Sequence, residues 1–219
     1  MPDRPFHHGN LRAALLDEAE KVLRERGARA LSLRELARAA GVSHGAPRTH
    51  FIDRNALLDA LAERGFLRLT AEMRTAADGA TGDHAALLRA VASAYVRFAV
   101  REPALLDLMF AAKVDGPSKE VQHAAEALFE TMAGIMNAGV KAGAYNANDV
   151  TRFTLLLSAT MQGIASLVAS RRITPPQGES LIDDAITVFL AGATATAARQ
   201  RNGSGPTAHT HPHTDPQPH

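Results

Sequence analysis

The 219-residue chain contains neither cysteine nor tryptophan, and aromatic residues make up only 5% of it. The absence of cysteine excludes disulfides, thiolate metal sites and cysteine nucleophiles, and it agrees with a reducing compartment. The ten N-terminal residues are polar and contain no apolar run, which is not the pattern of a secretory signal. We therefore expect a cytoplasmic protein whose stability depends on a packed core.

Strand signals are also missing, because no segment alternates apolar and polar residues over the length of a strand. Apolar residues instead recur at helical spacing along most of the chain, so an all-α fold of about nine helices is predicted. A Gly/Ala/Thr-rich loop is expected at residues 76–83. The expected helices cover residues 11–26, 32–40, 43–50, 53 to beyond 70, 83–98, 103–110, 117–139, 148–170 and 176–199.

One stretch, residues 153–170, carries no charge and approaches the length of a membrane span. Thr154, Ser158, Gln162 and other polar residues make it too polar for an isolated span. We interpret it as a helix that is buried in the protein or faces a partner, and we predict no membrane contact.

The formal net charge is only +1, but the charges are unevenly distributed. Residues 1–54 contain ten Arg and Lys against seven Asp and Glu, whereas the remainder has 14 basic and 16 acidic residues. A basic segment at one end suits contact with phosphates at that end only. A sequence-indifferent architectural DNA-binding protein, which is one alternative, would need greater overall basicity.

The most informative stretch is SLRELARAAGVSHGAPRTHFIDRNALLDAL, residues 32–61. Ser32 and Glu35 form a capping-box pattern at the start of one short helix, and Ser43 is expected to cap a second, with Pro47 in its first turn. Asp53 and Asp83 are expected to cap two later helices. The three residues 41–43 between them begin with Gly41, which can adopt the positive φ that a tight turn needs. Two short helices joined in this way match the helix-turn-helix plan, in which the polar face of the second helix enters the major groove.

Through this stretch the first 69 residues resemble the TetR (tetracycline-repressor) family of regulators. The shared pattern is A-x-x-A-G-V-S-x-G-x-[LP]-Y-x-H-F-x-x-K-x-x-L. The residues of this chain that match it are Ala37, Ala40, Gly41, Val42, Ser43, Gly45, Pro47, His50, Phe51 and Leu57. Arg48 stands where the family has Tyr, and Arg54 stands where it has Lys.

The resemblance implies an N-terminal three-helix helix-turn-helix domain over residues 9–69, with its motif at 32–51. It implies a helical regulatory and dimerisation domain over residues 70–200. We expect a flexible arm at 1–8 and a disordered His/Pro-rich tail at 201–219. The histidines of that tail could bind metal weakly, but no metal site is predicted.

The family also implies which residues contact DNA. Arg54 would hold a phosphate, Arg34 is expected to contact a phosphate rather than a base, and His50 either contacts DNA or packs between helices. The full predicted set is Ser32, Arg34, Ser43, His44, Gly45, Arg48, Thr49, His50 and Arg54.

In the second domain, the resemblance implies that helices near 148–170 and 176–199 form a homodimer interface; the alternative is an intrachain core. It also implies a pocket for an unidentified small-molecule effector. Each candidate lining residue could instead belong to the ordinary core. The candidates are Tyr95, Phe98, Met109, Phe110, Phe129, Met132, Met136, Phe153, Leu157 and Met161, with Leu106 as a further apolar candidate and Arg97, His123 and Gln162 as further polar candidates.

The predicted function is a ligand-responsive repressor that binds a palindromic operator in double-stranded DNA as a homodimer. A transcriptional activator of the same fold is an open alternative. An enzyme is disfavoured, because the chain contains no metal-ligand pair at helical spacing, no phosphate loop and no convincing Ser/His/Asp set. No catalytic residue and no cofactor are therefore predicted.

Overall fold

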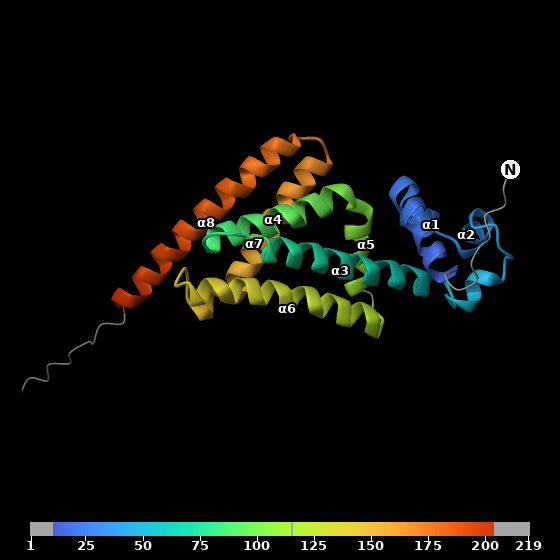
Figure 1. The fold of residues 1–219 in the computed structure, drawn as a ribbon, viewed down its shortest axis with the longest axis horizontal. Helices are drawn as coiled ribbons and strands as arrows, with labels where there is room; N and C mark the ends of the chain where they lie inside the picture. Colours follow the sequence, from blue (N-terminus) through green and yellow to red (C-terminus); the bar gives the residue numbers. More distant parts are fainter. Residues whose placement is uncertain (1–10, 115, 204–219) are drawn as a thin grey trace, which may run out of the picture.

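The computed structural model describes residues 11–114 and 116–203, and within them all regular structure is helical (Figure 1). The all-α prediction is confirmed, with eight α-helices in the described residues where about nine helices were expected. The elements are α1 (Leu11–Arg26), η2 (Ala28–Ala30), α2 (Leu33–Ala39), η3 (Ala46–Thr49), α3 (Arg54–Asp78), α4 (His84–Arg101), α5 (Pro103–Val114), α6 (Lys119–Lys141), η4 (Ala147–Asp149), α7 (Val150–Ala169) and α8 (Pro175–Gly203).

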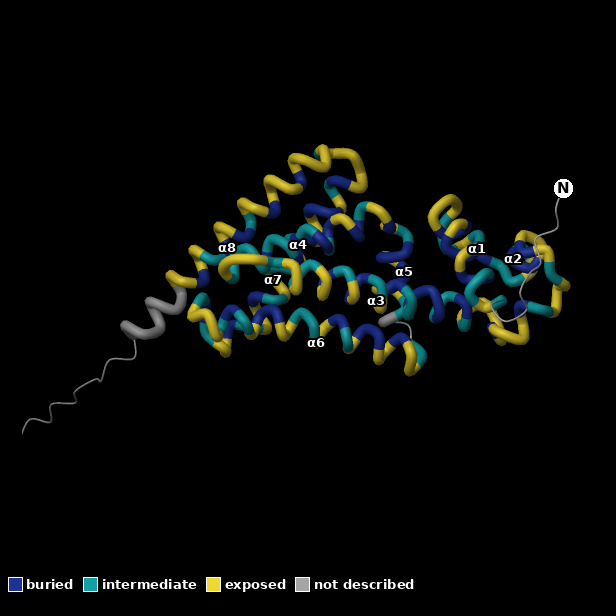
Figure 2. The backbone as a smooth tube through the Cα atoms, in the orientation of Figure 1, coloured by how far each residue is buried: buried dark blue, intermediate teal, exposed yellow. Residues whose placement is uncertain are grey.

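The helices form a small unit at one end, residues 11–53, which we call the head, and a larger bundle of α4–α8, which we call the body (Figure 1). The long helix α3 starts at the head and runs into the body, where it packs against α4, α5 and α6. Its side chains Leu57, Leu61, Phe66 and Leu69 are fully buried along this path. Figure 2 shows the buried residues on the inward faces of the helices in both parts.

Three helices begin at the capping residues that the sequence predicts. The side chains of Ser32, Asp53 and Asp83 accept hydrogen bonds from backbone N–H groups three residues later, at 3.1, 2.8 and 2.9 Å. Such caps satisfy donors that the first helical turn leaves free. In a capping box the Glu35 side chain would also bond back to the Ser32 N–H. In the structure the Glu35 carboxylate lies 3.9 Å from the Arg26 guanidinium.

Several predicted boundaries are wrong by a few residues. Helix α3 continues through Ala76 and Ala77 to Asp78, so the predicted loop at 76–83 is confined to 79–83. Alanine is the best helix former, and Gly79 ends the helix where the composition changes. Helix α8 likewise extends to Gly203, so residues 201–203 are helical rather than part of a disordered tail. The arm at 1–8 and the tail histidines lie outside the described residues.

The uncharged stretch forms most of α7, and a described segment at Ala147–Ala169 is long and apolar enough to cross a membrane by length and composition alone. In the structure it is a bundle helix that packs against α4, α6 and α8. Phe153, Met161, Ile164 and Val168 are buried on its inner face. A core helix of a soluble protein passes the same test of length and composition.

A buried polar contact joins α4 to the end of α6. The Tyr145 hydroxyl donates to the Met136 carbonyl at 2.9 Å, and it lies 3.0 Å from His84 Nε2. Because the hydroxyl hydrogen is used on Met136, His84 Nε2 must carry the proton that bonds Tyr145. His84 Nδ1 is then a buried acceptor with no hydrogen-bond partner in the described structure. Burial lowers the pKa of His84 below its ordinary value of 6.5, with a smaller opposing effect of Asp83.

Candidate nucleic-acid interface and ligand cavity

The turn after α2 is fixed by backbone geometry. The Gly41 N–H donates to the Arg38 carbonyl at 3.3 Å, and the Val42 N–H donates to the Ala37 carbonyl at 3.0 Å. These two bonds are the Schellman arrangement for a helix end. Gly41 has φ of +66°, a region where a side chain would be strained. The turn therefore sends the chain in a new direction at the position that the sequence predicts.

The following segment, expected as a short α-helix capped by Ser43, is instead the 3₁₀ turn η3 with Gly45 at its N-cap and no side-chain cap. The Ser43 backbone carbonyl, not its side chain, accepts from the Ala46 N–H at 3.0 Å. Pro47 lies in the first turn, as predicted. Because proline has no N–H, it removes one of the backbone hydrogen bonds that a longer helix would need. We call residues 43–50 the recognition segment.

Two buried residues anchor the recognition segment to the rest of the head. Pro47 is buried, and Phe51 is only 2% exposed. The Arg12 guanidinium of α1 lies over the Phe51 ring, 5.5 Å from its centroid. Because Pro47 and Phe51 are buried in the head, the polar side chains of the recognition segment lie on its solvent-exposed surface.

The exposed face of the head contains most of the predicted DNA contacts. Ser43, His44, Gly45, Arg48, Thr49 and His50 are all exposed, as is Arg34 on α2. Arg38, one turn after Arg34, is also exposed, although it is not among the predicted contacts. Such a face offers guanidinium groups for phosphates and polar side chains for base edges.

Two predicted contacts have other partners in the structure. Ser32 is half-buried, and its Oγ caps α2. The Arg54 guanidinium donates to the Ala28 carbonyl at 2.6 Å through Nη2 and to the Leu31 carbonyl at 3.1 Å through Nε. Arg54 thereby ties the start of α3 to η2. Its remaining N–H groups leave the predicted phosphate contact open.

The body contains a cavity of about 570 Å³ between α3, α4, α5, α6, α7 and α8. Seven of the ten predicted ligand residues line it, namely Tyr95, Phe110, Phe129, Met132, Met136, Leu157 and Met161. The lining also includes Met73, Leu88, Val91, Ala92, Asp107, Leu128, Ile135, Thr154, Leu155, Ser158, Ala159, Gln162 and Ile186. A volume of this size is typical of small-molecule sites.

The other three candidates lie in the core outside the cavity. Phe98 is fully buried between the guanidinium groups of Arg68 and Arg101, which lie 5.5 and 5.6 Å from its ring centroid. Met109 is also fully buried, close enough to Gly65 that a Cβ there would be 2.6 Å from its sulfur. Phe153 packs edge-on against the ring of Phe189, with centroids 5.0 Å apart.

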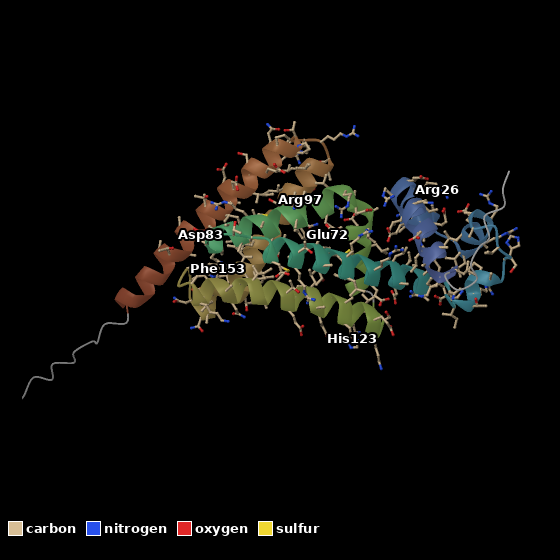
Figure 3. All side chains as sticks on the ribbon, in the orientation of Figure 1. Arg26, Glu72, Asp83, Arg97, His123 and Phe153 are labelled. Atoms are coloured by element: carbon tan, nitrogen blue, oxygen red, sulfur yellow. The ribbon has the colours of Figure 1, made fainter. Side chains whose placement is uncertain are left out.

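Of the three further polar candidates, one lines the cavity and two do not. Arg97 and His123, labelled in Figure 3, are exposed and do not line the cavity. Gln162 does line it and accepts a hydrogen bond from the Tyr95 hydroxyl through Oε1. Burial raises the pKa of Tyr95 to about 12, so the phenol stays protonated at neutral pH.

An ion-pair network connects the head to the corner between α4 and α5. Glu102, at this corner, is 8% exposed and lies 3.2 Å from Arg24 of α1 and 3.6 Å from Arg68 of α3. Glu20 of α1 is 9% exposed and lies 3.1 Å from the same Arg68 and 3.3 Å from Arg64. Pro103 then starts α5, whose next turns line the cavity.

A helix-turn-helix head with an exposed polar recognition segment, joined by one helix to a helical body, defines a DNA-binding transcriptional regulator. Residues 15–61 match the family model for bacterial regulatory proteins of the tetR family. Residues 88–189 match the model for the tetracyclin repressor-like C-terminal domain. The chain belongs to the TetR family of transcriptional regulators, and both matched domains are those of a regulator rather than an enzyme.

Solved structures share the fold. A protein of unknown function from Rhodococcus sp. RHA1 is 41% identical, covers 88% of this chain and 100% of its own, and has a TM-score of 0.80. The TetR family transcriptional regulator PfmR from Thermus thermophilus is 22% identical, covers 81% and 97%, and has a TM-score of 0.62. A tetR-family regulatory protein from Rhodococcus RHA1 is 18% identical, covers 84% and 97%, and has a TM-score of 0.66. No curated protein matches the sequence.

Proposed function

We propose that the protein is a ligand-responsive repressor that binds a palindromic operator as a homodimer in the cytoplasm. The observation that carries the proposal is the exposed recognition segment, which is held in place by the buried Pro47 and Phe51. We propose residues 9–69 as the DNA-binding domain and residues 70–200 as the regulatory and dimerisation domain. Residue 69 lies within α3, so one continuous helix would join the two domains.

Exposed apolar side chains support dimerisation through α7 and α8. Leu155 and Leu156 on α7 are 67% and 53% exposed, and Val188 on α8 is 72% exposed. Gly163 and Gly192 are also exposed on these helices, which permits close approach of a second copy. A two-fold dimer would present two recognition segments to half-sites about 34 Å apart, one turn of the DNA helix.

The response to an effector would depend on the cavity and the ion-pair network. A ligand that binds one arrangement of α5 better than another shifts the protein toward that arrangement. Because Glu102 at the start of α5 contacts Arg24 and Arg68, the shift would change how the head is held. The two heads would then no longer fit successive major grooves, and the operator would be released.

The test is selection of bound genomic fragments by the full-length protein at physiological salt, followed by gel-shift assays on the enriched site. Arg48→Ala and Thr49→Ala should each weaken binding about 5-fold to 150-fold, since a good base contact contributes about 1–3 kcal/mol. Arg97→Ala removes the same charge from the body and is the matched control. If no palindrome is enriched, the repressor proposal fails; a reporter fused to the enriched site distinguishes repression from activation.

A further inference from the structure

The cavity has a charge pattern that restricts the chemistry of its occupant. Its walls are mostly apolar, from Met73 on α3 to Ile186 on α8. Among the described lining residues, the one charged side chain is that of Asp107 on α5. Asp107 is exposed, and no other described residue forms a hydrogen bond or ion pair with its carboxylate. Among the described residues, one unpaired carboxylate therefore borders a mostly apolar, otherwise uncharged space.

The described lining offers no positive charge to an anionic group. No Arg, Lys or His is among the described residues that line the cavity. Backbone N–H groups are free to bind anions only in the first turn of a helix. The earliest lining residues of α4, α5 and α7 are Leu88, Asp107 and Thr154, each at the fifth position of its helix. Their N–H groups are already committed to the helical ladder.

Three arginines on the bordering helices have other partners. Arg74 of α3 donates to Thr131 at 3.0 Å, and Arg89 of α4 lies 3.2 Å from Asp183. Arg101 lies 2.6 Å from Glu72. An anionic ligand would have to break one of these contacts to pair with Arg74, Arg89 or Arg101.

The polar groups in the wall favour a ligand that donates. The Tyr95 hydroxyl uses its hydrogen on Gln162, and the Thr154 hydroxyl uses its hydrogen on the Val150 carbonyl at 2.8 Å. Both oxygens keep lone pairs that can accept from a ligand. Ser158 and Gln162 retain donor hydrogens, but neither is charged. The carboxylate of Asp107 adds the strongest acceptor.

We propose that the effector is a lipophilic cation whose apolar part fills the cavity and whose cationic group faces Asp107. This inference rests on the proposed function, because it assigns the chemistry of the effector to the same cavity. It predicts selectivity by charge among ligands of equal apolar size.

The experiment uses a fluorescent reporter built into the cavity wall. The chain has no tryptophan, so Phe110→Trp in the full-length protein places a single indole one helical turn from Asp107. Three ten-carbon probes are titrated at pH 7 below their aggregation concentrations: decylammonium, decanol and decanoate. Decylammonium should bind at least tenfold tighter than decanoate.

Charge removal supplies the second comparison. In the Phe110→Trp background, Asp107→Asn should weaken decylammonium binding about tenfold and leave decanol binding unchanged. Asp78→Asn is the matched control, because Asp78 is exposed at the end of α3 and does not line the cavity. It should leave the affinities of all three probes unchanged.

Three results would overturn the inference: decanoate binding as tightly as decylammonium, equal effects of the two Asp→Asn substitutions, or no fluorescence response to any probe. Operator binding without probes, measured in parallel by gel shift, tests the proposed function separately. Charge-selective binding with no palindrome bound would reject the repressor while keeping the effector class. A bound palindrome with no charge selectivity among the probes would reject the effector class while keeping the repressor.

Discussion

Replacing Phe51 by Ala tests whether this ring holds the recognition segment in place. The ring is 2% exposed, and removing a buried Phe side chain costs about 3–5 kcal/mol of folding free energy. The contact with the exposed Arg12 guanidinium adds about 0.5–1 kcal/mol. We therefore expect a loss of about 4 kcal/mol, which is a large part of the stability of a typical domain. The neighbouring Ile52 is 83% exposed, so Ile52→Ala should change stability by no more than about 0.5 kcal/mol.

The assay is urea denaturation followed by circular dichroism, combined with hydrogen exchange of the head. The Phe51 N–H donates to the Pro47 carbonyl at 2.9 Å, so its amide reports directly on opening of the recognition segment. In Phe51→Ala this amide should exchange much faster, while amides in the middle of α6 change little. Equal stability of the two variants would refute the assignment of Phe51 as the anchor.

Two further predictions concern the body. Because burial lowers the pKa of His84, the unfolded chain takes up a proton before the folded chain does; stability should be full above about pH 6.5 and fall as the pH decreases below it. Denaturation midpoints between pH 7.5 and 5.5 should show this slope, and His84→Gln should flatten it; an unchanged slope would assign the effect to another group. Val188→Asp, at a side chain 72% exposed on α8, should convert a dimer to a monomer in sedimentation experiments without loss of helicity. The control Ala133→Asp adds the same charge to an exposed position on α6, and equal dissociation by both variants would reject the α7–α8 interface.

Much of the fold follows from local chemistry that can be recognised in the sequence. Ser32, Asp53 and Asp83 cap helices as predicted, because a short polar side chain before an apolar helical pattern satisfies free N–H groups of its own first turn. The turn at Gly41 is equally local. The end of α3 was missed, since Ala76 and Ala77 suit either a helix or a small-residue loop, and packing against α6 supports the helix.

The cavity could be predicted only in part, because cavity walls and core use the same residue types. Phe98 and Met136 have similar apolar character, yet Phe98 is buried in the core beside Arg68 and Arg101, whereas Met136 lines the cavity. Their difference arises from how the helices cross, which no local pattern encodes. Asp107 was missed because, in the sequence, an isolated Asp on a helix resembles any solvated surface residue. Only the packing of the neighbouring helices shows that it borders the cavity.

The continuity of α3 makes it a mechanical lever between the two ends of the molecule. Its 25 residues extend over about 37 Å at 1.5 Å per residue. Met73, near its far end, lines the cavity, and its first residues lie beside the recognition segment. By simple geometry a tilt of about 5° displaces the opposite end of such a rod by about 3 Å, close to the rise of one base pair. Under the proposed function, a rearrangement of this size would move the recognition segment out of register with DNA without unfolding any helix.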